Sequence, residues 1–305
     1  MRIVFMGTPA FAVPTLDALI DAHEVVAVYA RPDAGSGRGR RISTSPVKQR
    51  ALETGIPVEQ PASMRDAAAV SGLRSYAPDL IVVAAYGAIL PPDVIDFPRL
   101  GCVNVHASLL PAWRGAAPIQ RAILAGDALA GISIMRMEAG LDTGPICSTR
   151  STPVGDKDAT SLTSELALMG AKLLTDKLPL IVSGEVYWAA QDDSLATYAA
   201  KITALDVALH PGLTVDDAWR RVRASGPSAP CKALIDGRRV TVLSARPSPA
   251  PVPAGTVSTE AGLLLGMEDG ALLLETLTPE DRSGMAATDW LRGARLSPDT
   301  HWSAS

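Results

Sequence analysis

The chain has 305 residues, of which 47% are hydrophobic and 20% charged, a composition typical of globular proteins with room for two domains. A formal net charge of −4 excludes a protein coated in positive charge, but it allows one local basic surface. The three cysteines lie far apart without a C-x-x-C pair, so we expect neither a disulfide framework nor a zinc site. The first residues do not resemble a signal peptide and no apolar run reaches about 18 residues, so we expect a soluble, cytoplasmic protein without membrane spans.

In its first two-thirds the chain alternates short apolar runs with helical patterns. Strands are predicted at residues 3–7, 24–30, 79–87, 101–108 and 131–137, and helices at about 9–22, 116–125 and 161–182. Apolar strands joined through helices are typical of a parallel sheet that is covered on both faces. We therefore predict an α/β fold with a Rossmann-like, doubly wound, mostly parallel sheet, whose ligands lie beyond the carboxyl ends of the strands.

The pattern changes beyond about residue 206. Two strand–turn–strand patterns follow, at residues 232–247 and 262–279, and one helix is predicted near residues 215–222. These elements predict a smaller, β-rich domain. We expect a first domain at residues 1–187, a linker at residues 188–205 and a C-terminal domain at residues 206–305.

Two polar residues, Asn104 and His106, stand at the end of the predicted strand at residues 101–108. Alternate strand side chains point to the same face, so these two share a face and Val105 points the other way. An asparagine amide can donate to a developing oxyanion, and a histidine can exchange a proton near neutral pH. Asp142 follows the next strand, and in a parallel sheet its loop lies at the same edge, where it can orient the imidazole. From spacing alone, a capped strand end and an ordinary turn explain these residues equally well.

The longer strings around these residues are more specific. The run "GCVNVHASLLPAWRGAAPIQRAI", followed by "GISIMRMEAGLDTGPI", resembles the 10-formyltetrahydrofolate-dependent formyltransferases. The similarity extends from "RIVFMGTPAFAVPTLDAL" to "LATYAAKI", about two-thirds of the chain, and is closest to the members that act on initiator methionyl-tRNA. It implies transfer of a formyl group from the cosubstrate 10-formyltetrahydrofolate to the α-amino group of the methionine on that tRNA, without a metal.

The resemblance also assigns roles to individual residues. It implies that Asn104, His106 and Asp142 are catalytic. It further implies that the folate is bound by a Ser-Leu-Leu-Pro turn and by a wall that follows the preceding strand, which together comprise Ser108, Leu109, Leu110, Pro111, Tyr86 and Gly87. For the last two residues, a plain strand–helix turn is nearly as good an explanation.

A locally basic segment lies at residues 31–50, where six basic residues and three glycines accompany one acidic residue. The glycines predict a mobile loop, and the charge favours contact with nucleic acid over an ordinary solvated surface. In the family an inserted loop at this place reaches the tRNA acceptor stem. Arg38, Arg40 and Arg41 are therefore the expected tRNA contacts.

A second basic segment lies at residues 218–250, with seven basic residues and one acidic residue. The family has an OB-like, tRNA-binding C-terminal domain in this region, and a basic face on a small β domain fits contact with an RNA backbone. The chain departs from the family here, because "ASGPSAPCK" at residues 224–232 replaces an aromatic "FNPWP" stretch. The details of the C-terminal fold and of its RNA contacts therefore stay open.

Other functions fit part of these features. A formyltransferase for a small amine, or a hydrolase with the same three catalytic residues, would not need two basic segments. A non-catalytic RNA-binding protein would not need Asn104, His106 and Asp142 together. The loop "GTPAF" lacks the G-x-G-x-x-G spacing, which disfavours a nicotinamide dehydrogenase. We expect a monomeric formyltransferase.

Overall fold

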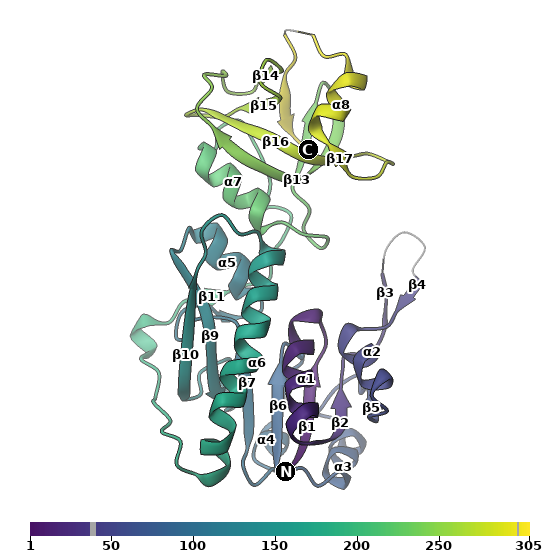
Figure 1. The fold of residues 1–305 in the computed structure, drawn as a ribbon, viewed down its shortest axis with the longest axis vertical. Helices are drawn as coiled ribbons and strands as arrows, with labels where there is room; N and C mark the ends of the chain where they lie inside the picture. The colour runs from purple at the N-terminus through teal and green to yellow at the C-terminus, as the bar shows by residue number, and fades with distance from the viewer. Residues whose placement is uncertain (37–40, 298) are drawn as a thin grey trace. The chain divides into compact units, whose positions relative to one another are not determined.

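The computed structural model describes residues 1–36, 41–297 and 299–305 (Figure 1). The chain forms two compact units. The first unit comprises residues 1–118, 129–153 and 162–199, and the second comprises residues 119–128, 154–161 and 200–305.

A seven-stranded sheet forms the centre of the first unit. Its strands are β1 (Arg2–Gly7), β2 (Glu24–Tyr29), β5 (Val58–Glu59), β6 (Leu80–Ala84), β7 (Cys102–His106), β9 (Leu129–Arg136) and β10 (Ile146–Pro153). They are arranged in the order β10-β9-β7-β6-β1-β2-β5. The five strands from β5 to β7 are parallel, whereas β9 and β10 are antiparallel to their neighbours. The predicted mostly parallel α/β sheet is thereby confirmed.

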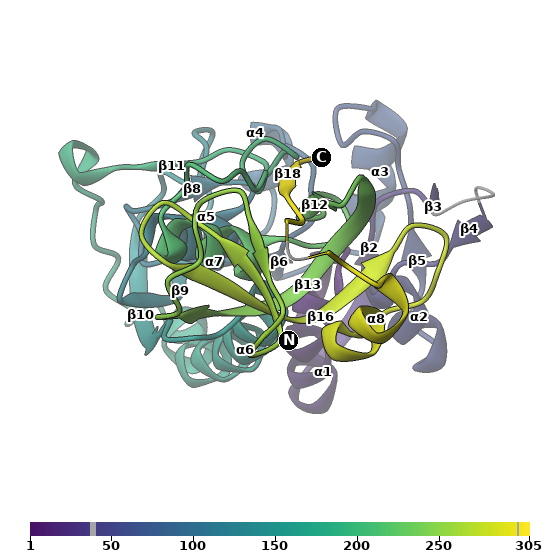
Figure 2. The same cartoon turned by 90° about the horizontal axis from the view of Figure 1, so that it is seen from above.

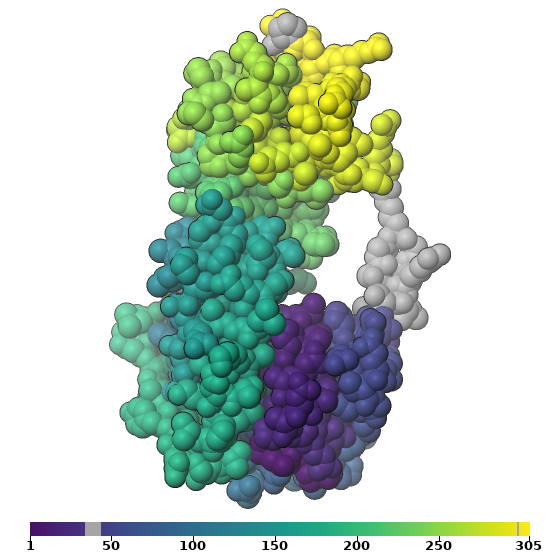
Figure 3. Space-filling view, in the orientation of Figure 1, coloured from purple at the N-terminus to yellow at the C-terminus, as the bar shows by residue number. Residues whose placement is uncertain are grey.

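Helices cover both faces of this sheet (Figure 2). On one face lie α1 (Val13–Ala22) and α6 (Ala159–Ser183), which form much of the purple and teal surface in Figure 3. On the other face, α3 (Ala67–Ser75) and α4 (Pro92–Ile95) pack on the even-numbered side chains of β1 and β7, in a core that includes Met6 and Cys102. Strand alternation therefore decides which helices each strand residue meets.

Local capping signals explain where several of these helices begin. Ser45 accepts a hydrogen bond from the backbone N–H of Lys48 at 3.3 Å at the start of α2 (Pro46–Glu53). Asp66 caps α3 in the same way. Such caps satisfy backbone donors that the helix leaves unpaired. The remaining short elements of this unit are η1 (Ala10–Ala12), β3 (Ala34–Ser36), β4 (Arg41–Ser43), β8 (Arg114–Gly115), η2 (Asp193–Leu195) and β11 (Tyr198–Ala199), while α5 (Pro118–Ala125) spans the boundary between the units.

Residues 200–305 of the second unit fold into a small β-rich structure, while its remaining residues, 119–128 and 154–161, come from the part of the chain that we expected to belong to the first domain. Its elements are α7 (Val215–Ala224), β12 (Lys232–Ile235), β13 (Arg238–Ser248), β14 (Val257–Ser258), β15 (Leu263–Gly266), β16 (Ala271–Pro279), β17 (Met285–Ala286), α8 (Ala287–Ala294) and β18 (Trp302–Ala304). The antiparallel sheet has the order β14-β15-β16-β13-β12-β18. Backbone hydrogen bonds from Val257 to Thr300 and from Trp302 to Gly255 join its two ends, so the sheet closes almost into a barrel.

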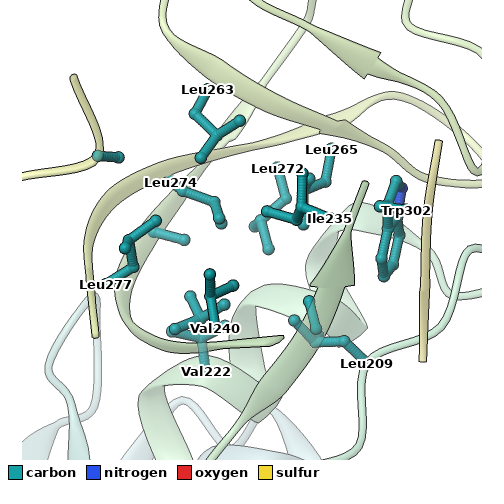
Figure 4. Packing of buried hydrophobic residues seen from close by; sticks show 14 of the residues in the cluster. Leu209, Val222, Ile235, Val240, Leu263, Leu265, Leu272, Leu274, Leu277 and Trp302 are labelled. Atoms are coloured by element: carbon teal, nitrogen blue, oxygen red, sulfur yellow. The ribbon is translucent and has the colours of Figure 1, made fainter. Parts of the chain in front are cut away.

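The interior of this barrel is mostly aliphatic, and its core also includes Trp290 and Trp302 (Figure 4 shows Trp302). Leu209 and Val222 contribute to it from outside the sheet, and Ile235, Leu265 and Leu272 contribute from three strands. The turn between β12 and β13 consists of Asp236 and Gly237, with φ of +52° and +71°. Aspartate followed by glycine suits a tight hairpin with two left-handed residues, which explains why this hairpin could be predicted from the sequence.

The sequence did not reveal β10, the edge strand of the first sheet. Its residues "ICSTRSTP" are mostly polar, and most of them are exposed or half-buried. An edge strand with one exposed side lacks the apolar run that identified the central strands.

Candidate active site

Asn104 and His106 lie on β7, and His106 is the last residue of that strand. Both are buried, with exposed fractions of 8% and 6%. Val105 points to the opposite face, where a Cβ on Gly170 of α6 would come within 2.6 Å of its side chain. The glycine therefore lets α6 approach the sheet closely. The prediction that Asn104 and His106 share a face is confirmed.

The imidazole of His106 has an oxygen atom beside each ring nitrogen. Nε2 lies 3.2 Å from the carbonyl oxygen of Trp113, and Nδ1 lies 3.7 Å from Oδ2 of Asp142. A carbonyl oxygen only accepts, so Nε2 carries the proton in the first contact. The second distance is longer than a hydrogen bond and corresponds to an electrostatic contact between two largely buried side chains.

Asp142 reaches His106 by a route that the sequence did not predict. Our expectation placed its loop at the carboxyl edge of a parallel sheet, and this was wrong, because β9 is antiparallel to β7. The end of β9 lies beside the start of β7, where the N–H of Met137 donates to the carbonyl oxygen of Cys102 at 2.8 Å. Residues 137–145 then fold back far enough for Asp142 to meet His106 at the other end of β7.

The Asp142 carboxylate is fixed by a backbone group. Its Oδ2 accepts a hydrogen bond from the N–H of Gly115 at 2.8 Å. Asp142 itself has φ of +52°, a left-handed conformation that aspartate tolerates better than most residues. The carboxylate is thereby held next to the imidazole by β8.

The side-chain amide of Asn104 is free of protein partners within the part of the chain that the structure describes. Asn104 as a whole is 8% exposed, but its amide is not among the buried polar groups left without a partner. The amide is therefore accessible to solvent and to a ligand. The arrangement can therefore offer an N–H donor beside His106 to an oxygen of a bound substrate.

The Ser-Leu-Leu-Pro turn begins two residues after the end of β7, and the side chain of Ser133 on β9 holds it in place. Ser133 is fully buried, and its hydroxyl donates to the carbonyl oxygen of Ser108 at 2.7 Å. The same hydroxyl accepts from the N–H of Leu110 at 3.0 Å. Ser108 in turn donates to the carbonyl oxygen of Ala112 at 2.6 Å, and the Leu110–Pro111 peptide bond is cis. Residues 108–111 are thus a tightly bonded turn beside His106.

Tyr86 and Gly87 follow β6, the strand next to β7. Val83 is paired with Asn104, so Tyr86 and Gly87 lie just beyond the end of β6, on the same side of the sheet edge as Asn104 and His106. Tyr86 is buried, which raises the pKa of its phenol, and its hydroxyl is a buried group without a partner among the described residues. Gly87 has φ of +80°, as a sharp corner requires. A strand–helix turn and a wall of a binding site are both compatible with this geometry.

Two of the expected tRNA contacts, Arg38 and Arg40, lie outside the described residues. Arg41 begins β4, which pairs with β3 as a hairpin. Further along the same basic segment, Lys48 contacts Asp33 at 2.5 Å and Arg50 contacts Asp17 at 2.5 Å. These two cations are therefore already paired within the protein.

The second basic segment is also more neutral than its sequence indicates. Acidic residues on β16 and just after it pair with its cations: Arg239 contacts Glu280 at 3.0 Å, and Arg246 contacts Glu275 at 3.4 Å. Arg223 is buried, with its guanidinium 3.9 Å from the ring centre of Trp219. A count along the sequence overstated the free positive charge, because it could not include partners from β16.

The described residues contain no group of three or more His, Cys, Asp or Glu side chains placed to hold a metal ion. Cys102, Cys147 and Cys231 are free thiols. Burial raises the pKa of Cys102 and of Cys231 to about 12, so both remain protonated at neutral pH. None of the helices in the described part of the chain is long and apolar enough to cross a membrane.

Sequence reasoning missed the residues that hold the site in place. Ser133 sits inside an apolar strand, and Gln191 lies in the predicted linker. A polar residue within the run "GISIMRM" was the available signal for Ser133. Gln191 had no comparable signal, because its contacts are with residues 47 to 77 positions away in the chain.

Comparison with known proteins identifies the class to which this α/β site belongs. Residues 1–178 match the family described as formyl transferase, and residues 213–295 match the formyl transferase C-terminal domain. Together these matches cover most of the chain, which belongs to the formyl transferase family.

Curated relatives agree over nearly the full length. The chain is 45% identical to the methionyl-tRNA formyltransferase of Methylococcus capsulatus over 302 residues, covering 97% of this chain and 98% of the relative. It is 46% identical to the methionyl-tRNA formyltransferase of Halorhodospira halophila, covering 97% of each.

More distant solved structures share the fold. HypX from Aquifex aeolicus in complex with tetrahydrofolic acid has a TM-score of 0.68 at 16% identity, covering 95% of this chain and 47% of HypX. An N-formyltransferase from Helicobacter canadensis, in complex with folinic acid and dTDP-3-aminofucose, has a TM-score of 0.60 at 15% identity, covering 89% of this chain and 97% of that protein.

Proposed function

We propose that the protein transfers a formyl group from 10-formyltetrahydrofolate to the α-amino group of the methionine carried by initiator tRNA. The observation that carries this proposal is the identity of about 45%, over nearly the whole of both chains, to proteins named methionyl-tRNA formyltransferase. The grouping of Asn104, His106 and Asp142 around the end of β7 supports it, because formyl transfer needs an oxyanion donor and a proton carrier in one place.

In the proposed reaction the amine nitrogen attacks the formyl carbon, forming a carbon–nitrogen bond and a tetrahedral oxyanion. Asn104, whose amide is free of protein partners in the described structure, donates to that oxygen. Collapse of the intermediate breaks the bond to N10 of the folate. The proton lost by the amine passes to N10 through His106, whose imidazole is oriented by Asp142.

Little base strength is needed for this chemistry. The unperturbed pKa of an α-amino group is about 8, so part of the amine is already neutral near pH 7. Formyl transfer can therefore rest on positioning and oxyanion stabilisation, without a metal. The reaction rate should therefore depend mainly on how precisely the site positions its groups, and less on the strength of one base.

We propose that the folate lies against residues 108–111 and the Tyr86–Gly87 corner. The turn is fixed by the buried hydroxyl of Ser133, and the corner follows β6, the strand paired with β7. For the tRNA, we propose contacts through Arg38, Arg40 and Arg41 and through the C-terminal unit, and we propose that the enzyme acts as a cytoplasmic monomer.

The test is formyl transfer from 10-formyltetrahydrofolate to charged initiator methionyl-tRNA, with free methionine and a reaction without acceptor alongside. We expect transfer to the tRNA alone. Folate turnover without formylated tRNA would instead support a small-amine formyltransferase or a hydrolase.

The catalytic assignment has its own test. We expect Asn104→Ala and His106→Ala each to lower the single-turnover rate by roughly a hundredfold or more. Near-normal rates in both variants would remove these residues from the mechanism.

A further inference from the structure

We infer, resting on the function proposed above, that Gln191 is a positioning residue for the catalytic aspartate. Gln191 and β11 would then help to hold the active site, in addition to connecting the chain onward. Gln191 would hold the backbone of the Asp142 loop, and Arg114 would hold Gln191. All of the contacts involved lie within the first unit.

Residues 188–199 are bonded to the site loops along most of their length. Ala189 exchanges two backbone hydrogen bonds with Ile146, at 2.8 and 2.9 Å. Further on, the hydroxyl of Thr197 accepts from the N–H of Trp113 at 2.9 Å. The short strand β11 then pairs in parallel with β8, which contains Arg114 and Gly115. The segment therefore contacts the chain on both sides of the site.

Gln191 lies between these two attachments and uses its whole amide. Its Nε2 donates to the carbonyl oxygens of Asp142 at 2.8 Å and of Gly144 at 2.7 Å. Its Oε1 accepts from Nε and from a terminal nitrogen of Arg114, at 3.1 and 2.8 Å. An arginine only donates, so the orientation of the amide is unambiguous. The two carbonyls that it binds belong to the loop that carries the catalytic carboxylate.

Arg114 supplies the fixed end of this arrangement. Its side chain is 2% exposed, and it also contacts Asp193 at 2.7 Å. A planar guanidinium that binds two acceptors loses little further freedom, so it can set the direction of the glutamine amide. Arg114 and Gln191 thus form a bonded path from β8 to the Asp142 backbone.

The neighbouring residue of β8 completes a closed loop of contacts. The N–H of Gly115 donates to the carboxylate of Asp142, while Gln191 holds the main chain of the same residue. Gly115 has φ of +123°, and a Cβ there would lie 2.8 Å from the carbonyl oxygen of Ala199. The approach of β11 therefore requires glycine, and residues 188–199 help to place both groups that hold Asp142.

The first variants are Gln191→Ala and Gln191→Glu in the full chain. Glutamate keeps the shape and the acceptors for Arg114, but it places an oxygen against the carbonyls of Asp142 and Gly144. For both variants we expect kcat to fall roughly ten- to hundredfold, since small misplacements of a catalytic group cost that much. We expect KM for the tRNA and for the folate to stay within about twofold of wild type.

Two further readouts separate positioning from loss of general stability. Hydrogen exchange should quicken at the Gly115 amide, which reports its bond to Asp142, and this measurement does not depend on activity. In an Asp142→Ala background, Gln191→Ala should lower kcat by less than about threefold, because the positioned carboxylate is already gone.

The matched control is Asp192→Asn, next to Gln191 in the chain. Asp192 is exposed, and its carboxylate bonds to Ser194 in its own turn. We expect wild-type kcat and exchange from this variant. Unchanged kcat and Gly115 exchange in both Gln191 variants would overturn the inference. So would a loss of kcat from Gln191→Ala that is as large in the Asp142→Ala background as in the wild type. A wild-type enzyme that formylates no tRNA would refute the proposed function. Hydrogen exchange at Gly115 would still show whether Gln191 holds the Asp142 loop.

Discussion

The hydroxyl of Ser133 offers a direct test of how the proposed folate turn is held. Ser133→Ala removes the acceptor for the N–H of Leu110 and the donor to the carbonyl oxygen of Ser108. All three residues are buried, with exposed fractions between 0% and 7%. The variant therefore leaves one backbone donor and one backbone acceptor without their partner in the interior.

The size of the effect follows from those two groups. A buried donor or acceptor left unpaired costs about 1–3 kcal/mol, so the two groups together should cost the native turn roughly 2–6 kcal/mol. Part of that loss should be relieved by movement of residues 108–111 away from the geometry that the folate needs. We expect KM for 10-formyltetrahydrofolate to rise about tenfold, which corresponds to about 1.4 kcal/mol of binding free energy.

The assay combines steady-state kinetics with hydrogen exchange. KM for the folate should rise, KM for the tRNA should stay within about twofold, and the amide of Leu110 should exchange faster. Ser151→Ala is the control, because Ser151 lies on the edge strand β10 and is exposed. If Ser133→Ala matches Ser151→Ala in both folate KM and Leu110 exchange, the reasoning about the turn is refuted.

Two further predictions concern charge. Arg38→Ala should raise KM for the tRNA with little effect on KM for the folate, and unchanged tRNA kinetics would count against the basic loop as a contact. The hydrogen bond from Arg121, together with one from the N–H of Thr203, lowers the pKa of Asp206 from its ordinary 3.8 to about 2. Because this pKa is lower in the folded state, the stabilisation is present above about pH 4 and is lost as the pH falls towards 2. Asp206→Asn should therefore cost about 1 kcal/mol of unfolding free energy at pH 7 and almost nothing at pH 2, whereas an equal cost at both pH values would exclude this ion pair as the cause.

The central strands and the catalytic pair were predictable because their signals are local. The runs that became β1, β2 and β6 are apolar after at most one charged first residue, as strands buried on both faces must be, and β7 departs from that pattern only at Asn104 and His106. The relation between Asn104 and His106 follows from the two-residue period of a strand and needs no partner. The hairpin at Asp236 and Gly237 was equally legible, since its turn chemistry lies in adjacent residues.

The direction of β9 was not predictable in this way. An apolar run looks the same whether its strand is parallel or antiparallel to its neighbour, because the side-chain period is two in both cases. The antiparallel course of β9 moves the start of the Asp142 loop to the opposite edge of the sheet. Only the return of residues 137–145 brings the carboxylate to within 3.7 Å of His106.

Electrostatic pairing in the C-terminal unit shows the same limit. Residues 218–250 look strongly basic when counted along the chain, yet Glu275 of the neighbouring strand β16 and Glu280, just after that strand, pair with two of their arginines. Charges that neutralise each other across a sheet can be far apart in sequence. The sign of a surface is therefore a property of the folded strands.

The sequence by itself determined the α/β sheet, the small β domain and the face shared by Asn104 and His106, because apolar runs and strand alternation are properties of neighbouring residues. Tertiary structure alone decided how Asp142 reaches the imidazole and which residues hold it there. Gln191 contacts the Asp142 loop across 49 positions and Arg114 across 77. Such hydrogen bonds form only after the sheet has brought distant segments close together, so the local sequence pattern cannot predict them.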